Sequence, residues 1–168
     1  MPKKALSSYY LSDAYFYYLV EKSGYPLEQA SLLIEECLKM LMLLPNTKWF
    51  IPVSPAVDDI WHLMILETKC YQELCAHLPH KKFIHHQSVI YLNIQAKLEK
   101  KETQIDLLQR KEVINEKVSW LISYVTNFGD FTSETVEHWN WAKEIIQSMS
   151  ISIEELNKML REIQLSFS

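Results

Sequence analysis

Glycine is nearly absent from this sequence, with only Gly24 and Gly129 among 168 residues. Antiparallel sheets and barrels need repeated turns with positive φ, and glycine is the residue that usually supplies them. Two glycines cannot serve many hairpins, so the composition argues strongly against an all-β fold. The same scarcity excludes glycine-rich phosphate-binding loops, because neither the G-x-G-x-x-G pattern nor a P-loop can be written with these residues.

Cysteine and positive charge are also in short supply. The three cysteines, Cys37, Cys70 and Cys75, form no Cys-x-x-Cys pair, which predicts reduced thiols in a cytosol-like compartment. The net charge of −4 and the pI of about 5.9 argue against nucleic-acid binding, which depends on neutralising phosphates. No run approaches the roughly 18 apolar residues of a membrane span, and no signal peptide is evident. We therefore expect a cytoplasmic protein, with export by a route without a cleavable signal left open.

Apolar residues make up 48% of the chain and charged residues 23%, the balance of an ordinary folded domain. We predict an all-α fold, a single-domain bundle of about six helices spanning residues 1–168. The expected helical ranges are 13–22, 26–44, 54–76, 88–127, 132–149 and 152–165. The range 88–127 is either one long helix or two with a polar break. Pro52 predicts one short extended connector around residues 48–53.

Local signals mark several of these helix ends. Ser54 followed by Pro55 is typical of a helix start, because the hydroxyl caps and proline suits the first turn. Ser152 and Glu155 have the spacing of a capping box before the C-terminal helix at about 152–165. Thr132 is the expected N-terminal cap of the preceding helix, at about 132–149.

The stretch 54–86 concentrates five of the six histidines of the chain. At about 100° per residue, one buried stripe of the helix 54–76 contains Val57, Trp61, Met64, Thr68, Tyr71 and Cys75. Asp58 and His62 are four residues apart at the edge of this stripe. That spacing lets the carboxylate accept a hydrogen bond from the imidazole and so fix its tautomer.

Two interpretations of this stretch stay open. Because the turn at Pro79 sends the chain back, His62 can meet His85 or His86, and these three imidazoles would suit a metal or acid–base site. Asp58 or Asp59 would support the imidazoles, and zinc with an activated water is the expected cofactor in that case. In the structural interpretation, which we favour, there is no cofactor. Trp61, Tyr71 and Cys75 are then core, and Asp58 is favourable simply near a helix N-terminus.

The same stretch resembles the GRDP-like family, the helical region of glycine-rich domain-containing proteins and of bacterial relatives of unknown role. The residues that carry the resemblance are Ser54 to Leu66, Tyr71, Cys75 and Phe83 to His86, with Tyr124 to Gly129 and Trp139 farther on. The similarity covers about residues 25–142 and implies no established chemistry. Met64 stands where the family has the second histidine of a His-x-His pair. Two such residues on a helix point about 200° apart, so the pair could hardly chelate one ion.

The sequence therefore suggests a non-enzymatic helical module that binds a partner protein. The expected binding surface is the charged stretch 97–117 or the aromatic residues near the N-terminus. No nucleophile has a base at a fixed spacing, so catalysis is the less favoured alternative. The competing hypothesis is the metal-binding or acid–base site centred on His62, His85 and His86.

Overall fold

Helices make up the regular structure of this protein in a computed structural model that describes residues 3–46, 52–103, 106 and 111–168. The α-helices are α1 (Ala5–Tyr10), α2 (Asp13–Ser23), α3 (Leu27–Leu43), α4 (Pro55–Leu66), α5 (Thr68–His77), α6 (Val89–Leu98), α8 (Lys111–Phe128), α9 (Asn140–Met149) and α10 (Ile153–Ser166). Two 3-10 helices, η1 (Leu44–Asn46) and η2 (Val136–His138), complete the set. Among these residues there is no strand, only an isolated β-bridge, so the predicted all-α class is confirmed.

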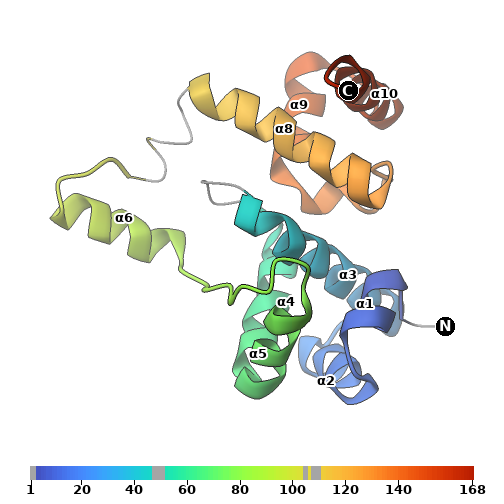
Figure 1. Cartoon of the computed structure of the whole chain (residues 1–168), viewed down its shortest axis with the longest axis vertical. Coiled ribbons are helices and arrows are strands. Elements are labelled where there is room, and N and C mark those ends of the chain that lie inside the picture. The colour runs from blue at the N-terminus through green and yellow to red at the C-terminus, as the bar shows by residue number, and fades with distance from the viewer. Residues whose placement is uncertain (1–2, 47–51, 104–105, 107–110) are drawn as a thin grey trace.

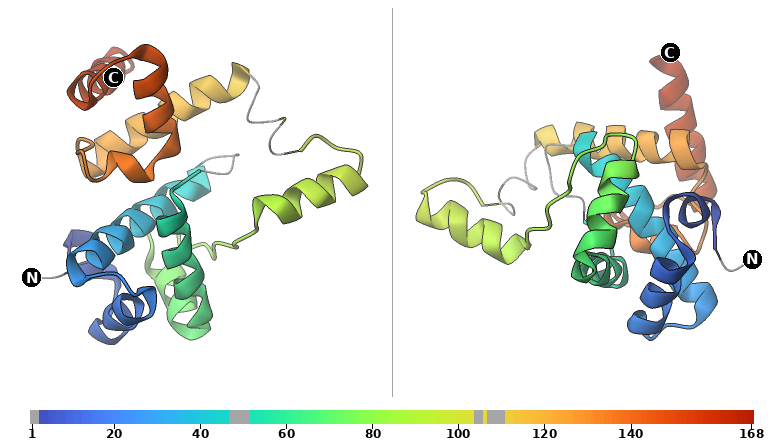
Figure 2. Two further views of the ribbon diagram at one scale, coloured as in Figure 1. Left: turned by 180° about the vertical axis from the view of Figure 1, so that it is seen from behind. Right: turned by 60° about the horizontal axis from the view of Figure 1, so that its bottom comes forward.

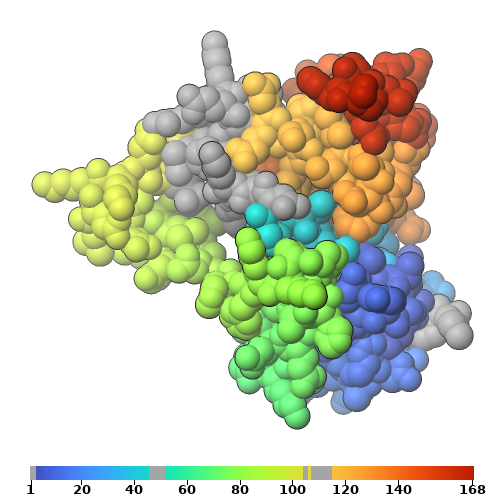
Figure 3. Space-filling model, in the orientation of Figure 1, coloured from blue at the N-terminus to red at the C-terminus, as the bar shows by residue number. Residues whose placement is uncertain are grey.

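Helix α3 lies at the centre of the arrangement (Figure 1). It packs against α1, α2 and α4 on one side and against α8 on the other, and α8, α9 and α10 form a second group. Buried apolar side chains from both groups join in one cluster around α3. Both further views show α6 standing away from these groups (Figure 2), and the space-filling view shows it as a projection from the body (Figure 3).

The expectation of about six helices is too low, since the described residues contain nine α-helices. One unexpected helix, α1, receives its N-terminal cap from another helix. The carboxylate of Glu35 on α3 accepts from the backbone N–H groups of Leu6 and Ser7, at 2.8 and 3.0 Å. Exposed N–H groups at a helix start need such acceptors. No local sequence signal reports an acceptor that lies 28 residues away.

A second difference is the break in the helix expected over residues 54–76. Glu67, with φ −88° and ψ 72°, separates α4 from α5. The hydroxyl of Tyr15 on α2 donates to the carbonyl of Met64 at 2.8 Å, which satisfies an acceptor near the end of α4. Because of the break, Thr68 is exposed and does not belong to the buried stripe. The other five predicted stripe residues are buried.

The range 88–127 contains two separate helices, α6 and α8, with residues 104–105 and 107–110 outside the described part. The helix expected from Thr132 begins only at Asn140, so that boundary was wrong. The hydroxyls of Thr132 and Thr135 instead accept from each other's backbone N–H groups, which holds a turn. Trp139 is then extended and forms an antiparallel bridge with Val53. The rest of the expected connector at 48–53 falls largely outside the described residues.

Two of the three predicted helix starts, those at Ser54 and at Ser152, are confirmed. The Ser54 hydroxyl accepts from the Val57 N–H at 3.3 Å, and Pro55 opens α4. Ser152 and Glu155 form the capping box of α10. Gly24 ends α2 in the left-handed conformation at φ 71°, which glycine adopts without strain.

Candidate functional site

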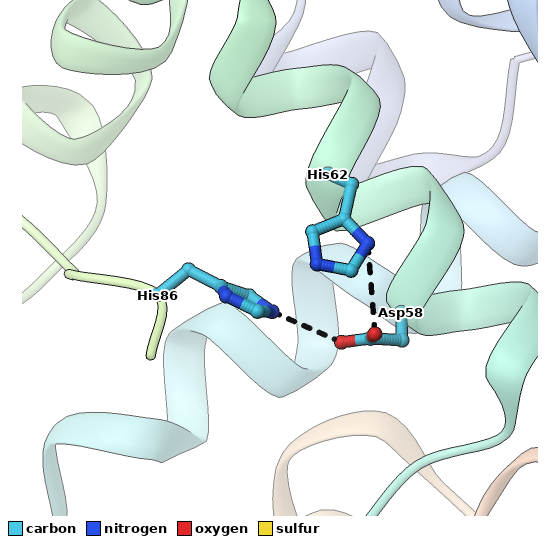
Figure 4. A group of neighbouring side chains, drawn as sticks. All are labelled: Asp58, His62 and His86. Atoms are coloured by element: carbon cyan, nitrogen blue, oxygen red, sulfur yellow. Dashed lines mark hydrogen bonds and ion pairs between the residues drawn. The ribbon is translucent and has the colours of Figure 1, made fainter. Parts of the chain in front are cut away.

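Asp58, His62 and His86 converge beside the exposed edge of α4 (Figure 4). Asp58 and His62 lie one turn apart, with His62 Nδ1 at 3.6 Å from Asp58 Oδ2. His86 comes from the segment that follows α5, and its Nε2 lies 3.2 Å from the other carboxylate oxygen, Oδ1. Since a carboxylate only accepts, this Nε2 carries the hydrogen in the bond. One carboxylate therefore faces two imidazoles, one through each oxygen.

Hydrogen bonds through Tyr71 hold the segment that carries His86. The indole Nε1 of Trp61 donates to the Tyr71 hydroxyl at 3.0 Å, and that hydroxyl donates to the Ile84 carbonyl at 2.6 Å. Burial raises the pKa of Tyr71, so the phenol keeps the proton that it donates. These bonds connect α4, α5 and the returning segment. The motif residues Trp61 and Tyr71 thus serve both the core and the placement of His86.

Ring contacts complete the placement of the two imidazoles. The His86 ring lies edge-on to the Trp61 indole, with centroids 4.4 Å apart, and its centroid is 4.3 Å from that of His62. The His86 side chain is 15% exposed, against 38% for Asp58 and 51% for His62. The cluster is therefore anchored on its His86 side and open to solvent on its His62 side. Imidazole nitrogens and carboxylate oxygens at such an edge can accept protons or coordinate a cation.

The other residues predicted for the site lie elsewhere. His85 is exposed, and its ring packs against Phe83 with centroids 4.8 Å apart. Asp59 is exposed on α4, outside the cluster of ligand atoms found among the described residues. Cys75, which was predicted as a core residue and not as a ligand, is buried in the core. Consecutive residues of an extended segment point to opposite sides, so only one of His85 and His86 can face α4.

The remaining histidines of the stretch have structural contacts. His77 Nδ1 lies 3.0 Å from the Glu73 carbonyl, one turn earlier on α5. His80 Nε2 lies 3.2 Å from the Leu41 carbonyl, and His80 Nδ1 accepts from the Lys82 N–H at 3.0 Å. These contacts satisfy backbone groups at helix ends and in the turn. Of the five histidines in 54–86, two therefore belong to the cluster with Asp58. The other three, His77, His80 and His85, make contacts elsewhere.

Sequence reasoning missed a buried carboxylate, Glu36 on α3. Its Oε2 accepts from the Tyr124 hydroxyl at 2.9 Å and from the Trp139 indole Nε1 at 2.7 Å, while Oε1 pairs with Lys39 at 2.6 Å. Glu36 is fully buried and joins α3 to α8 and to the start of α9. A signal was present, because Leu33 and Met40 place position 36 within an apolar face of the helix.

A hydroxyl–imidazole pair, Ser54 and His138, also lies in this region at 2.8 Å between Oγ and Nδ1. The same Ser54 oxygen accepts from the Val57 N–H, and the Ser54 N–H donates to the His138 carbonyl at 3.0 Å. The pair thereby attaches the start of α4 to η2. Its contacts are those of a helix cap rather than of a nucleophile with a free approach.

A second candidate surface is the outer side of α6. None of its ten residues, all of which the structure describes, is buried. Ile90, Tyr91, Ile94 and Leu98 are exposed, Ile90 to 73% and Leu98 to 80%. At about 100° per residue these side chains fall within one third of the helix circumference. We call these four residues the α6 apolar face.

The two binding surfaces predicted from the sequence are less informative than the α6 apolar face, which was not predicted. The charged stretch 97–117 includes residues outside the described ranges. Near the N-terminus, Tyr9 and Tyr17 are exposed, but Tyr15 and Phe16 are buried. All three cysteines are described, and no disulfide joins them. Cys37 is fully buried in an apolar site, and this burial raises the pKa of its thiol.

No family model, curated protein or solved structure matches this chain. The similarity to the GRDP-like family stays a prediction from its motif residues. Among the described residues, no helix combines the length and apolar character needed to cross a membrane.

Proposed function

We propose that this chain is a non-enzymatic interaction module whose helix α6 binds an apolar groove on a partner protein. The observation that carries the proposal is the α6 apolar face, a set of large apolar side chains on a helix that buries none of its own residues. Exposed apolar side chains gathered on one helix face are typical of protein-binding sites, whereas scattered ones are ordinary.

The spacing of the face suits insertion into a groove. Ile90, Ile94 and Leu98 follow one another at intervals of four residues, with Tyr91 beside them. Helices that bind in apolar grooves use anchors at such spacings. Fully burying an aliphatic side chain of this size contributes roughly 1.5–3 kcal/mol, so three anchors supply a substantial part of a binding free energy.

The local structure of α6 supports the same role. The Ser88 hydroxyl accepts from the Tyr91 N–H at 3.1 Å, and the chain turns at Lys100 with φ 55°. A helix of ten residues is marginal without packing, so contact with a partner would stabilise it. Lys97 is the only basic residue in α6, which favours a protein partner over nucleic acid.

Site-specific photo-crosslinking in cells of the source organism tests the proposal. A photoreactive residue at Ile94 should give a discrete crosslinked product, and the same residue at the exposed Lys158 of α10 should not. Adding Ile90→Asp to the first protein should abolish the product without unfolding the domain, because position 90 is exposed. The proposal fails if position 94 gives no product, or if the product survives Ile90→Asp.

A further inference from the structure

We propose that Asp58, His62 and His86 bind one divalent transition-metal ion of the zinc class. The proposal is independent of the α6 partner, because it rests on a different set of contacts. Each of these three residues offers one ligand atom, and the three atoms lie within 4.8 Å of one another. They come from two parts of the chain that other interactions already hold together.

The spacing of the ligand atoms is close to what an ion requires. Zinc–ligand bonds of about 2.0–2.1 Å in a tetrahedron place ligand atoms about 3.3 Å apart. His86 Nε2 lies 3.2 Å from Asp58 Oδ1, and His62 Nδ1 lies 3.6 Å from the other oxygen, Oδ2. With one ligand atom from each residue, all three atoms lie within 4.8 Å, so they must move closer together to hold one ion. To bring the three ligand atoms to the spacing of a bound ion, the His62 side chain must move. It is half exposed and can change rotamer at small cost.

The donor set selects the class of ion. Two imidazoles and one carboxylate favour zinc and its neighbours cobalt and nickel, whereas calcium and magnesium prefer oxygen ligands. The exposed side of the cluster, next to His62, leaves a further coordination position for water. For the ion to bind His86 Nε2, the hydrogen on that nitrogen moves through solvent to Nδ1, and the neutral ring then offers the lone pair of Nε2 to the ion.

A purely structural role accounts for only part of this arrangement. The contact between Asp58 and His86 attaches the returning segment to α4 and needs no further group. It does not account for His62, a second imidazole directed at the same carboxylate from an exposed position. Partly exposed ion pairs contribute only about 0–1 kcal/mol, so the second imidazole gains little from the pairing itself.

The support around His86 makes the site partly preorganised. The Trp61 ring contacts the imidazole, and the bond from Tyr71 to the Ile84 carbonyl fixes the backbone two residues earlier. Groups that orient a ligating histidine strengthen metal binding in this way. Ser88, which caps α6, follows two residues later, so a bound ion would also fix the base of α6 on α4.

Calorimetric titration of the full, tag-free chain with Zn²⁺ tests the site. We expect one ion per chain, with affinity reduced at least about 100-fold in His62→Ala, in His86→Ala and in Asp58→Asn, because even groups that only support a ligand are worth 10–100-fold. The matched control is His85→Ala, which removes the adjacent exposed imidazole and should leave the affinity unchanged. With Zn²⁺, which is diamagnetic, the NMR signals of the His62 and His86 rings should shift strongly and those of the His85 ring should change little.

Three results would overturn the site. They are no Zn²⁺ binding to the wild-type chain, equal binding by wild type and His62→Ala, or an equal loss in His85→Ala and His86→Ala. Replacing His86 also removes a contact with Trp61, so circular dichroism must show that this variant is folded. His62 is half exposed and does not contribute to the folded structure through Trp61. If His86→Ala unfolds, the Zn²⁺ affinity of His62→Ala alone decides whether the site exists.

Discussion

Glu36 and Asp58 are both carboxylates on adjacent, packed helices, yet they differ in burial and in the groups that face them. Glu36 is fully buried and accepts from a phenol, an indole and an ammonium group. Asp58 is 38% exposed and faces two imidazoles. The donors around Glu36 come from rigid aromatic side chains and a lysine with little exposure, whereas His62 can move in solvent.

The difference separates a structural carboxylate from a candidate ligand. A buried charge must be fully hydrogen-bonded, and all the bonds of Glu36 are made within the fold. Nothing can enter there without breaking the contact between α3, α8 and Trp139. At Asp58 the partners are exchangeable, because a neutral imidazole can move its hydrogen to the other ring nitrogen and coordinate an ion. The following changes test this contrast, beginning with the largest expected effect on stability.

Glu36→Ala should cost about 3–5 kcal/mol of the free energy of unfolding, because it leaves the Tyr124 hydroxyl, the Trp139 indole and Lys39 without their shared acceptor. Chemical denaturation measures the loss. Glu28→Ala, an exposed change in the first turn of the same helix, is the control and should cost below about 1 kcal/mol. Similar losses for both variants would show that the buried network is not a main contact between the two groups of helices.

Tyr71→Phe should cost about 1–3 kcal/mol, because it leaves the Trp61 indole N–H and the Ile84 carbonyl unpaired in a buried place. Hydrogen exchange at residues 84–86 should accelerate, since the segment loses its tie to α5. Tyr91→Phe, on exposed α6, provides the matched control. Unchanged exchange at 84–86 in Tyr71→Phe would mean that other contacts place His86.

His138 links the two regions, because it contacts the cap of α4 and lies near Glu36. Burial lowers its pKa below the usual value near 6.5, and Lys143 acts in the same direction, while Glu36 and Glu137 oppose the shift. The folded state therefore disfavours the charged ring. Stability should fall as the pH drops through 6.5 toward the lower folded pKa. Denaturation at several pH values should show a smaller acid-side loss in His138→Gln, and an equal loss would contradict this.

Asp58→Asn should change the free energy of unfolding by less than about 1 kcal/mol, because the contacts of this carboxylate are partly exposed. Asp59→Asn, at the neighbouring exposed position, is the control for loss of charge near the start of α4. Denaturation curves of the two variants should nearly coincide. If Asp58→Asn lowered the free energy of unfolding as much as Glu36→Ala, Asp58 would be a structural carboxylate like Glu36.

Part of the site could be foreseen from the sequence. The four-residue spacing of Asp58 and His62 on a helix begun by Ser54 is a local relation, and helical geometry alone brings the two side chains together. The choice of His86 over His85 could not be foreseen. It depends on which side of an extended segment faces α4, and the bond between Tyr71 and the Ile84 carbonyl sets that orientation.

Across the whole chain, too, local relations could be predicted from the sequence and long-range contacts could not. Caps, prolines and two glycines act over a few residues, so they established the all-α class and most helix starts directly from the order of the amino acids. The cap of α1, the break at Glu67 and the aromatic partners of Glu36 involve groups separated by 28 to 103 residues. Such contacts depend on how the helices pack, because a buried polar group bonds to whichever donor or acceptor the folded chain brings within reach.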